Sequence, residues 1–129
     1  MATSECQYRG PNNESCHHHP EIDDLCYWHD SKVKNEPDLI ERLESRAQSG
    51  EPMIGFSLRR ADLRGINLVN NHHKKGFQLT HSDLYRCDLR DAHLFHIDMT
   101  GSSLMKANLS HANLNCALLE NANLLGLQL

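Results

Sequence analysis

The sequence has few aromatic residues and no long apolar run. Aromatic residues make up 5% of its 129 positions, and the mean hydropathy is −0.60. No stretch approaches the ~20 consecutive apolar residues of a membrane-spanning helix, so we expect no membrane segment in this chain. Residues 1–15 are polar and lack the basic head and apolar stretch of a secretory signal. Together these absences predict a cytoplasmic protein.

The charge is unevenly distributed along the chain. Residues 1–50 carry 5 Lys and Arg against 10 Asp and Glu, a net charge of −5, whereas residues 51–129 carry 8 against 7, a net charge of +1. This balance argues against nucleic-acid binding, which requires a basic patch to contact phosphates. The cysteines number five, and an odd number in a chain without a secretory signal argues against a disulfide framework.

The second half of the chain has a period of five residues. From Phe77 onward, ten consecutive blocks place Leu or Met third: FQLTH, SDLYR, CDLRD, AHLFH, IDMTG, SSLMK, ANLSH, ANLNC, ALLEN and ANLLG. Three earlier blocks, residues 56–70, have the same phase, and residues 71–76 form a polar interruption. A period of five suits neither an amphipathic helix nor an alternating strand. It indicates a solenoid.

These blocks resemble the pentapeptide repeat family, whose pattern is Ala-(Asp/Asn)-Leu-x-x. The resemblance covers residues 56–129. It implies an all-β solenoid, a right-handed quadrilateral β-helix of about 3.6 coils with four blocks in each coil. If the interruption is counted as part of the first coil, Phe56 and Phe77, 21 residues apart, should share one inward column.

Residues 36–50 are predicted to form one capping α-helix. Pro37 suits the first turn and Gly50 suits the stop. The apolar face of this segment is narrow. A partner-binding helix is the alternative, but we favour a cap over the unpaired edge of the first coil, because an open edge invites aggregation.

The C-terminal end has no predicted cap. Residues 124–129 contain four leucines and continue the repeat to the last position. Two interpretations stay open: the chain is the N-terminal part of a longer protein, or a second subunit covers this end in a homodimer through the C-terminal coil.

The N-terminal segment contains a candidate metal site. Cys6, Cys16, Cys26 and His29 offer three thiols and one imidazole, a set that zinc binds tetrahedrally. Cys26 and His29 resemble the Cys-x-x-His knuckle of small zinc-binding motifs. Four protein ligands leave no open position, so the predicted zinc is structural; one of the histidines at 17–19 is an alternative to Cys16. We divide the chain into a zinc-binding segment (1–35), a capping helix (36–50) and a β-helix (51–129).

The two remaining cysteines have different predicted positions. Cys87 occupies the small inward position that Ala takes in other blocks, so we expect a buried packing residue. Cys116 takes an outward position, one coil above His96, and two stacked ligands are too few to predict a second metal site.

No catalytic constellation is present, so we predict a protein that is not an enzyme. The favoured function is a zinc-stabilised β-helix module for protein–protein interaction or scaffolding, with an unknown protein partner. Tyr85, Phe95 and Met105 are its larger outward side chains. The alternative comes from the resemblance: some pentapeptide repeat proteins mimic DNA and inhibit DNA gyrase. That mimicry needs a long acidic rod, which this charge distribution does not provide.

Overall fold

The computed structural model describes residues 5–16, 25–72 and 75–129. Its helix α1 spans Leu39–Gln48 and lies within the predicted segment 36–50. The helix ends where Gly50 adopts φ +84° and donates its N–H to Ala47 O, a terminus for which glycine is preferred. No helix in the described part of the chain has the length and apolarity needed to cross a membrane.

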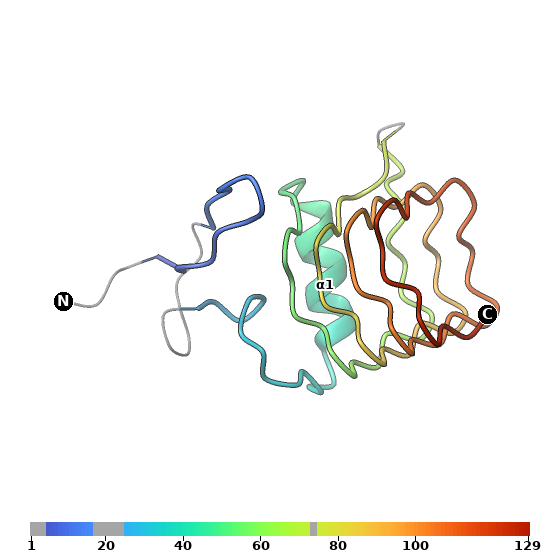
Figure 1. Cartoon of the computed structure of the whole chain (residues 1–129). Coiled ribbons are helices and arrows are strands. Elements are labelled where there is room, and N and C mark those ends of the chain that lie inside the picture. The colour runs from blue at the N-terminus through green and yellow to red at the C-terminus, as the bar shows by residue number, and fades with distance from the viewer. Residues whose placement is uncertain (1–4, 17–24, 73–74) are drawn as a thin grey trace.

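The repeat blocks form stacked coils that pair side by side (Figure 1). Each pairing is a single-residue parallel bridge, for example Asp83 with Ser103 and Asp88 with Asn108. These bridges join residues 20 positions apart, so four blocks make one coil. The five-residue period therefore produces a β-helix-like solenoid, as the repeat pattern predicts.

The predicted register of the first coil is wrong. Ser57 pairs with Asp83, an offset of 26 residues and not 21. Asp83 N donates to Phe56 O, and this bond places Phe56 above Ser82, whereas the bond from Asp98 N to Phe77 O places Phe77 above Ile97. The physical reason is that residues 71–76 are additional to the coil and do not replace one of its four sides.

Two local features explain why each block takes its shape. The Asp or Asn before the central leucine bonds the backbone two residues on, as Asp83 Oδ1 does when it accepts the N–H of Tyr85 at 3.0 Å. The fifth residue of most blocks adopts a positive φ, for example Arg86 at +56° and Lys106 at +58°. This left-handed conformation turns the chain through each corner.

Leucines fill the axis of the solenoid. Leu58, Leu84 and Leu104 succeed one another in neighbouring coils, and each is fully buried. Cys87 is also buried, at 1% exposure, and its thiol donates to Leu58 O at 2.6 Å. The prediction that Cys87 is a packing residue is therefore confirmed.

The two ends of the coil stack differ. Helix α1 lies against the end formed by the first coil (Figure 1), where it buries Leu39, Leu43 and Ala47 and where Glu44 Oε2 accepts the N–H of Asn67 at 2.8 Å. At the opposite end, leucines are exposed: Leu118 at 55%, Leu125 at 68% and Leu129 at 81%.

Candidate metal centre

The structure brings the four predicted metal ligands together. The ligand atoms of Cys6, Cys16, Cys26 and His29 all lie within 4.8 Å of one another. Cys16 follows a small hairpin closed by the antiparallel bridge between residues 9 and 15. The histidines at 17–19, the alternatives to Cys16, lie outside the described residues.

The spacing within the cluster fits a tetrahedral ion. Cys16 Sγ lies 3.8 Å from Cys26 Sγ, and His29 Nδ1 lies 3.2 Å from Cys26 Sγ and 3.4 Å from Cys6 Sγ. With Zn–S bonds of ~2.3 Å and Zn–N bonds of ~2.0 Å, tetrahedral ligands lie ~3.8 Å apart for two sulfurs and ~3.5 Å apart for sulfur and nitrogen. These three distances are thus within about 0.3 Å of those that a zinc ion requires.

A tight turn returns His29 to Cys26. The N–H groups of His29 and Asp30 both donate to Cys26 O, at 3.1 and 3.0 Å. The Cys26 N–H donates to Cys6 Sγ at 3.2 Å and links the turn to the first cysteine. The spacing of two residues between Cys26 and His29 is what allows a single turn to present both side chains to one point.

A bond to the first coil orients the imidazole. His29 Nε2 lies 2.8 Å from Ile54 O, which can only accept, so Nε2 carries the proton and donates. In this neutral tautomer Nδ1 carries no proton, so it can accept or coordinate, and this atom is the one that faces the thiols. Tyr8 stacks on the same imidazole, with ring centroids 3.9 Å apart. Such outer contacts hold a metal-binding histidine in one tautomer and orientation.

Burial keeps the Cys26 thiol protonated when no cation is bound. Burial raises the pKa of the Cys26 thiol to about 12; the backbone N–H of His29 opposes this rise and the charge of Cys16 adds to it. Without a cation, this thiol is therefore neutral at physiological pH. A divalent cation would have to displace the proton, and its charge would offset the cost of burying thiolates.

Aromatic packing docks the cluster onto the first coil. The rings of Trp28 and Phe56 stack with centroids 5.1 Å apart and planes 6° apart. Beside them, the N–H of Ser57 donates to Trp28 O at 2.7 Å. The segment that carries the cluster is thus attached to the solenoid through both side chain and backbone.

A second contact joins the same segment to α1. The Arg42 guanidinium lies 3.9 Å from the centroid of the Tyr27 ring, and the Tyr27 hydroxyl donates to Glu36 Oε2 at 2.7 Å. Burial and this bond raise the pKa of Tyr27. The same bond lowers the pKa of Glu36. Tyr27 therefore bridges the metal segment and the helix.

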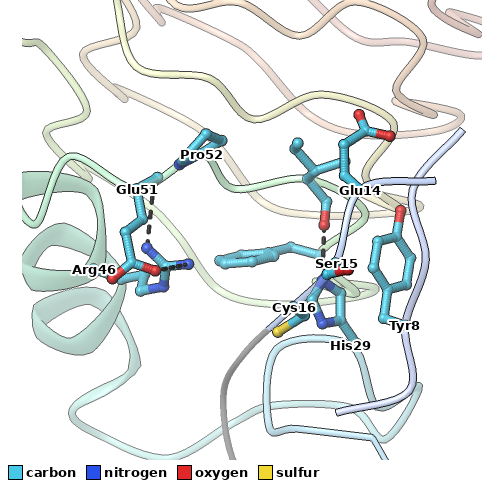
Figure 2. A pocket seen from close by; sticks show the side chains of 10 residues that line it. Tyr8, Glu14, Ser15, Cys16, His29, Arg46, Glu51 and Pro52 are labelled. Carbon is cyan, nitrogen blue, oxygen red and sulfur yellow. Dashed lines mark hydrogen bonds and ion pairs between the residues drawn. The ribbon is translucent and has the colours of Figure 1, made fainter. Parts of the chain in front are cut away.

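A pocket of about 280 Å³ lies beside the cluster. Tyr8, Cys16 and His29 line one side, and Arg46 and Glu51 line the other (Figure 2). Cys16, at 8% exposure, is the least buried of the three cysteines of the cluster. The pocket therefore offers an entry path for an ion.

The predicted outward residues do not form one surface. Tyr85 and Met105 are half-buried and lie in neighbouring coils, whereas Phe95 is 37% exposed and lies two blocks further along, on the opposite side of the coil. Cys116 is exposed, and its corner adjoins that of His96 in the next coil.

The comparisons agree with the repeat architecture. Residues 102–129 match the family model described as "Pentapeptide repeats (8 copies)". Residues 102–129 are thus similar to pentapeptide repeats, and such repeats imply a right-handed β-helix-like fold.

Several solved chains match this one. One of them is the pentapeptide repeat protein Rfr23 from the cyanobacterium Cyanothece 51142, at 28% identity over 56% of this chain and 55% of that chain. This chain thus matches about half the length of that protein. The TM-score of 0.17 carries no argument about the fold. No curated protein gives a significant match.

Proposed function

We propose that this chain is a non-enzymatic interaction or scaffolding module in which a structural zinc ion fastens the N-terminal segment over one end of the solenoid. One observation carries the proposal: His29 faces the thiols through Nδ1 and bonds the first coil through Nε2. A metal held by Cys6, Cys16, Cys26 and His29 would thus fix the position of the whole segment on the coil. In this proposal the metal-bound segment and helix α1 both cover the first coil.

The donor set supports zinc and a structural role. Three thiolates and one imidazole suit a borderline-soft ion, and four protein ligands would complete a tetrahedral sphere. In this proposal residues 1–35 form the zinc-binding segment, residues 36–50 the helical cap and residues 51–129 the β-helix. None of the five cysteines, all of which lie in the described part of the chain, is paired in a disulfide, which suits a reducing compartment such as the cytoplasm.

The family and the charge both favour an interaction module. Pentapeptide repeat proteins are generally non-enzymatic. An inhibitor of gyrase that mimics DNA would need an acidic rod, whereas residues 51–129 carry 8 Lys and Arg against 7 Asp and Glu. Six of these eight basic residues lie on two adjacent sides of the coils, which leaves those sides unlike DNA.

We also propose that two copies pair through the C-terminal coil. The support is the exposure of Leu118, Leu125 and Leu129, because a face of this kind is typical of a contact surface. Replacing Leu118 with Asp should convert a dimer into monomers in sedimentation velocity. A wild-type monomer, or a dimer that survives this substitution, would reject the pairing.

The zinc proposal is tested by thermal melting with matched cysteine variants. A strong zinc chelator should lower the melting temperature of the wild type, and Cys26→Ser should melt at that lower temperature with or without chelator. Cys116→Ser is the control, because Cys116 is exposed and distant in sequence from the cluster; it should behave as wild type. A chelator that leaves the wild-type melting temperature unchanged would contradict a structural metal.

The partner-binding half of the proposal has its own test. Tyr85, Phe95 and Met105 are changed together to Ser, and the proteins captured by this variant and by wild type are compared. Loss of a captured protein supports the outer faces as the binding surface. Identical captures would remove these three side chains from consideration.

A further inference from the structure

Three basic residues occupy the same corner in three successive coils. Arg60 N donates to Tyr85 O at 2.8 Å, and Arg86 N donates to Met105 O at 3.0 Å, which places Arg60 above Arg86 and Arg86 above Lys106. All three are exposed and adopt φ between 56° and 58°. We call these three residues the corner ladder. Neighbouring coils lie ~4.8 Å apart, so its backbone positions follow one another at that spacing.

The corner ladder differs from the adjacent basic column. That column consists of Arg64 and Arg90. Arg64 Nη2 lies 2.8 Å from Asp62 Oδ2, and Arg90 Nη2 lies 2.6 Å from Asp88 Oδ2. None of the three ladder residues makes an ion pair with any residue that the structure describes. Like charges on adjacent strands destabilise a sheet. No described acidic side chain offsets this repulsion, whereas an anionic ligand would.

Three guanidinium groups surround the ring of Tyr85. The guanidinium groups of Arg59, Arg60 and Arg86 lie 5.0, 5.8 and 5.5 Å from the centre of its ring. Only Arg59 has an acidic partner among the described residues, Asp83 at 3.2 Å. The ring thus holds two guanidinium groups close together with donors available for an anion.

An apolar row runs beside the corner ladder. Tyr85, Met105 and Leu125 each lie one coil further along from the three ladder residues, and their backbone carbonyls accept the N–H groups of Arg60, Arg86 and Lys106. Tyr85 and Met105 are half-buried, and Leu125 is 68% exposed. The surface therefore presents a cationic row and an apolar row side by side.

We propose that the corner ladder and the apolar row bind an acidic peptide segment of a partner protein. Carboxylates of the peptide would bond Arg60 and Arg86, whose guanidinium groups take carboxylates in bidentate pairs, and would also bond the Lys106 ammonium group. Apolar side chains of the peptide would cover Met105 and Leu125. A nucleic-acid backbone would satisfy the cations but not the apolar row. This inference rests on the proposed interaction function.

The test uses a defined peptide and two variants with the same change in charge. Binding of a fluorescein-labelled peptide of alternating Glu and Leu to the full zinc-loaded chain is followed by fluorescence anisotropy. We expect affinity to fall as salt is added. The double variant Arg60→Gln/Arg86→Gln should bind at least about tenfold more weakly. The control Arg64→Gln/Arg90→Gln, in the paired column, should lose less than about threefold.

A second variant tests the apolar row, and circular dichroism confirms that every variant is folded. Met105→Ser/Leu125→Ser should also weaken binding. Equal losses in the ladder and control variants would overturn the proposal, because general charge would then explain the affinity. Tighter binding of a single-stranded oligothymidylate than of the peptide would also overturn it in favour of a nucleic-acid occupant.

The same variants separate this inference from the function on which it rests. If a partner captured by wild type binds Arg60→Gln/Arg86→Gln equally well, the corner ladder is not the binding site and the interaction function stands. If the triple variant of the outward residues and both double variants all capture the same proteins as wild type, the interaction function loses its support on these faces too.

Discussion

Trp28 stacks face to face on Phe56, and this pair joins the metal segment to the end of the solenoid. Phe56 heads an inward column that continues with two small residues, Ser82 and Ser102, both buried. The N–H of Phe56 donates to Ser82 Oγ at 3.0 Å, which ties this end to the next coil. A large ring fits at this position because it faces the N-terminal segment as well as the coil below.

Replacing Phe56 with Ala should detach the metal segment from the first coil of the solenoid. Removing a buried aromatic side chain costs ~3–5 kcal/mol of the free energy of unfolding. Trp28 is the one tryptophan of the chain, so its emission should shift to the red as the indole becomes exposed. Denaturant unfolding measures the energy and fluorescence reports the docking. Phe95→Ala is the control, since Phe95 is 37% exposed; an equal loss in both variants would contradict the role of Phe56.

The interruption at residues 71–76 should be removable without loss of the fold. Asn70 ends one five-residue block and Phe77 begins the next, so deleting residues 71–76 restores an unbroken repeat. We expect this variant to fold with the same circular dichroism spectrum and to differ by less than about 1 kcal/mol in the free energy of unfolding.

Deleting residues 61–65 is the contrasting experiment. It removes one side of the coil together with buried Ala61 and Leu63, so cooperative unfolding should be lost. If the deletion of 71–76 is the more damaging of the two, the observed register is wrong.

The sequence predicts which residues point inward within each block but not the register of the first coil against the second. Leu and Met at every fifth position fix the inward residues within each block, and Cys87 could be assigned to the interior in this way. The period does not say whether six extra residues replace one side of a coil or are added to it. An offset of 21 would place Arg60 above His81, whereas the structure places it above Arg86. The sequence pattern alone therefore does not predict the corner ladder.

Thiol reactivity should follow burial. Burial raises the pKa of the Cys87 thiol to about 12, and its sulfur bonds Leu58 O, whereas Cys116 is exposed. In the folded zinc-loaded protein, a thiol reagent should label Cys116 rapidly, and Cys87 should react only after unfolding. Peptide mapping by mass spectrometry identifies the labelled residue. Rapid labelling of Cys87 in the native state would contradict its place in the core.

Tyr27 should control the titration of Glu36. The hydrogen bond from Tyr27 lowers the pKa of Glu36, so its stabilising effect is present above the ordinary pKa of Glu and is lost as pH falls through the lowered value. Tyr27→Phe removes the donor and should raise the Glu36 pKa toward the ordinary range. NMR titration of the Glu36 side-chain carboxyl measures this change. An unchanged pKa would show that the hydrogen bond is absent in solution.

The sequence predicts the ligands of the metal cluster but not the contacts that orient them. Three cysteines and a histidine can be found by residue type, and the turn from Cys26 to His29 follows from their spacing. The partners that orient the imidazole cannot: Ile54 contributes a backbone carbonyl, and Tyr8 meets His29 only through the tertiary fold. Neither contact has a sequence motif, because both join segments distant in the chain.

A native mass spectrum of the purified chain tests the central claim most directly, because it reports bound metal and subunit number together. The account predicts one zinc ion per chain in the wild type and none in Cys26→Ser, with Cys116→Ser retaining the ion. A wild-type chain that carries no zinc while Trp28 fluorescence shows the N-terminal segment docked would contradict it, since the segment would then hold its place without a metal.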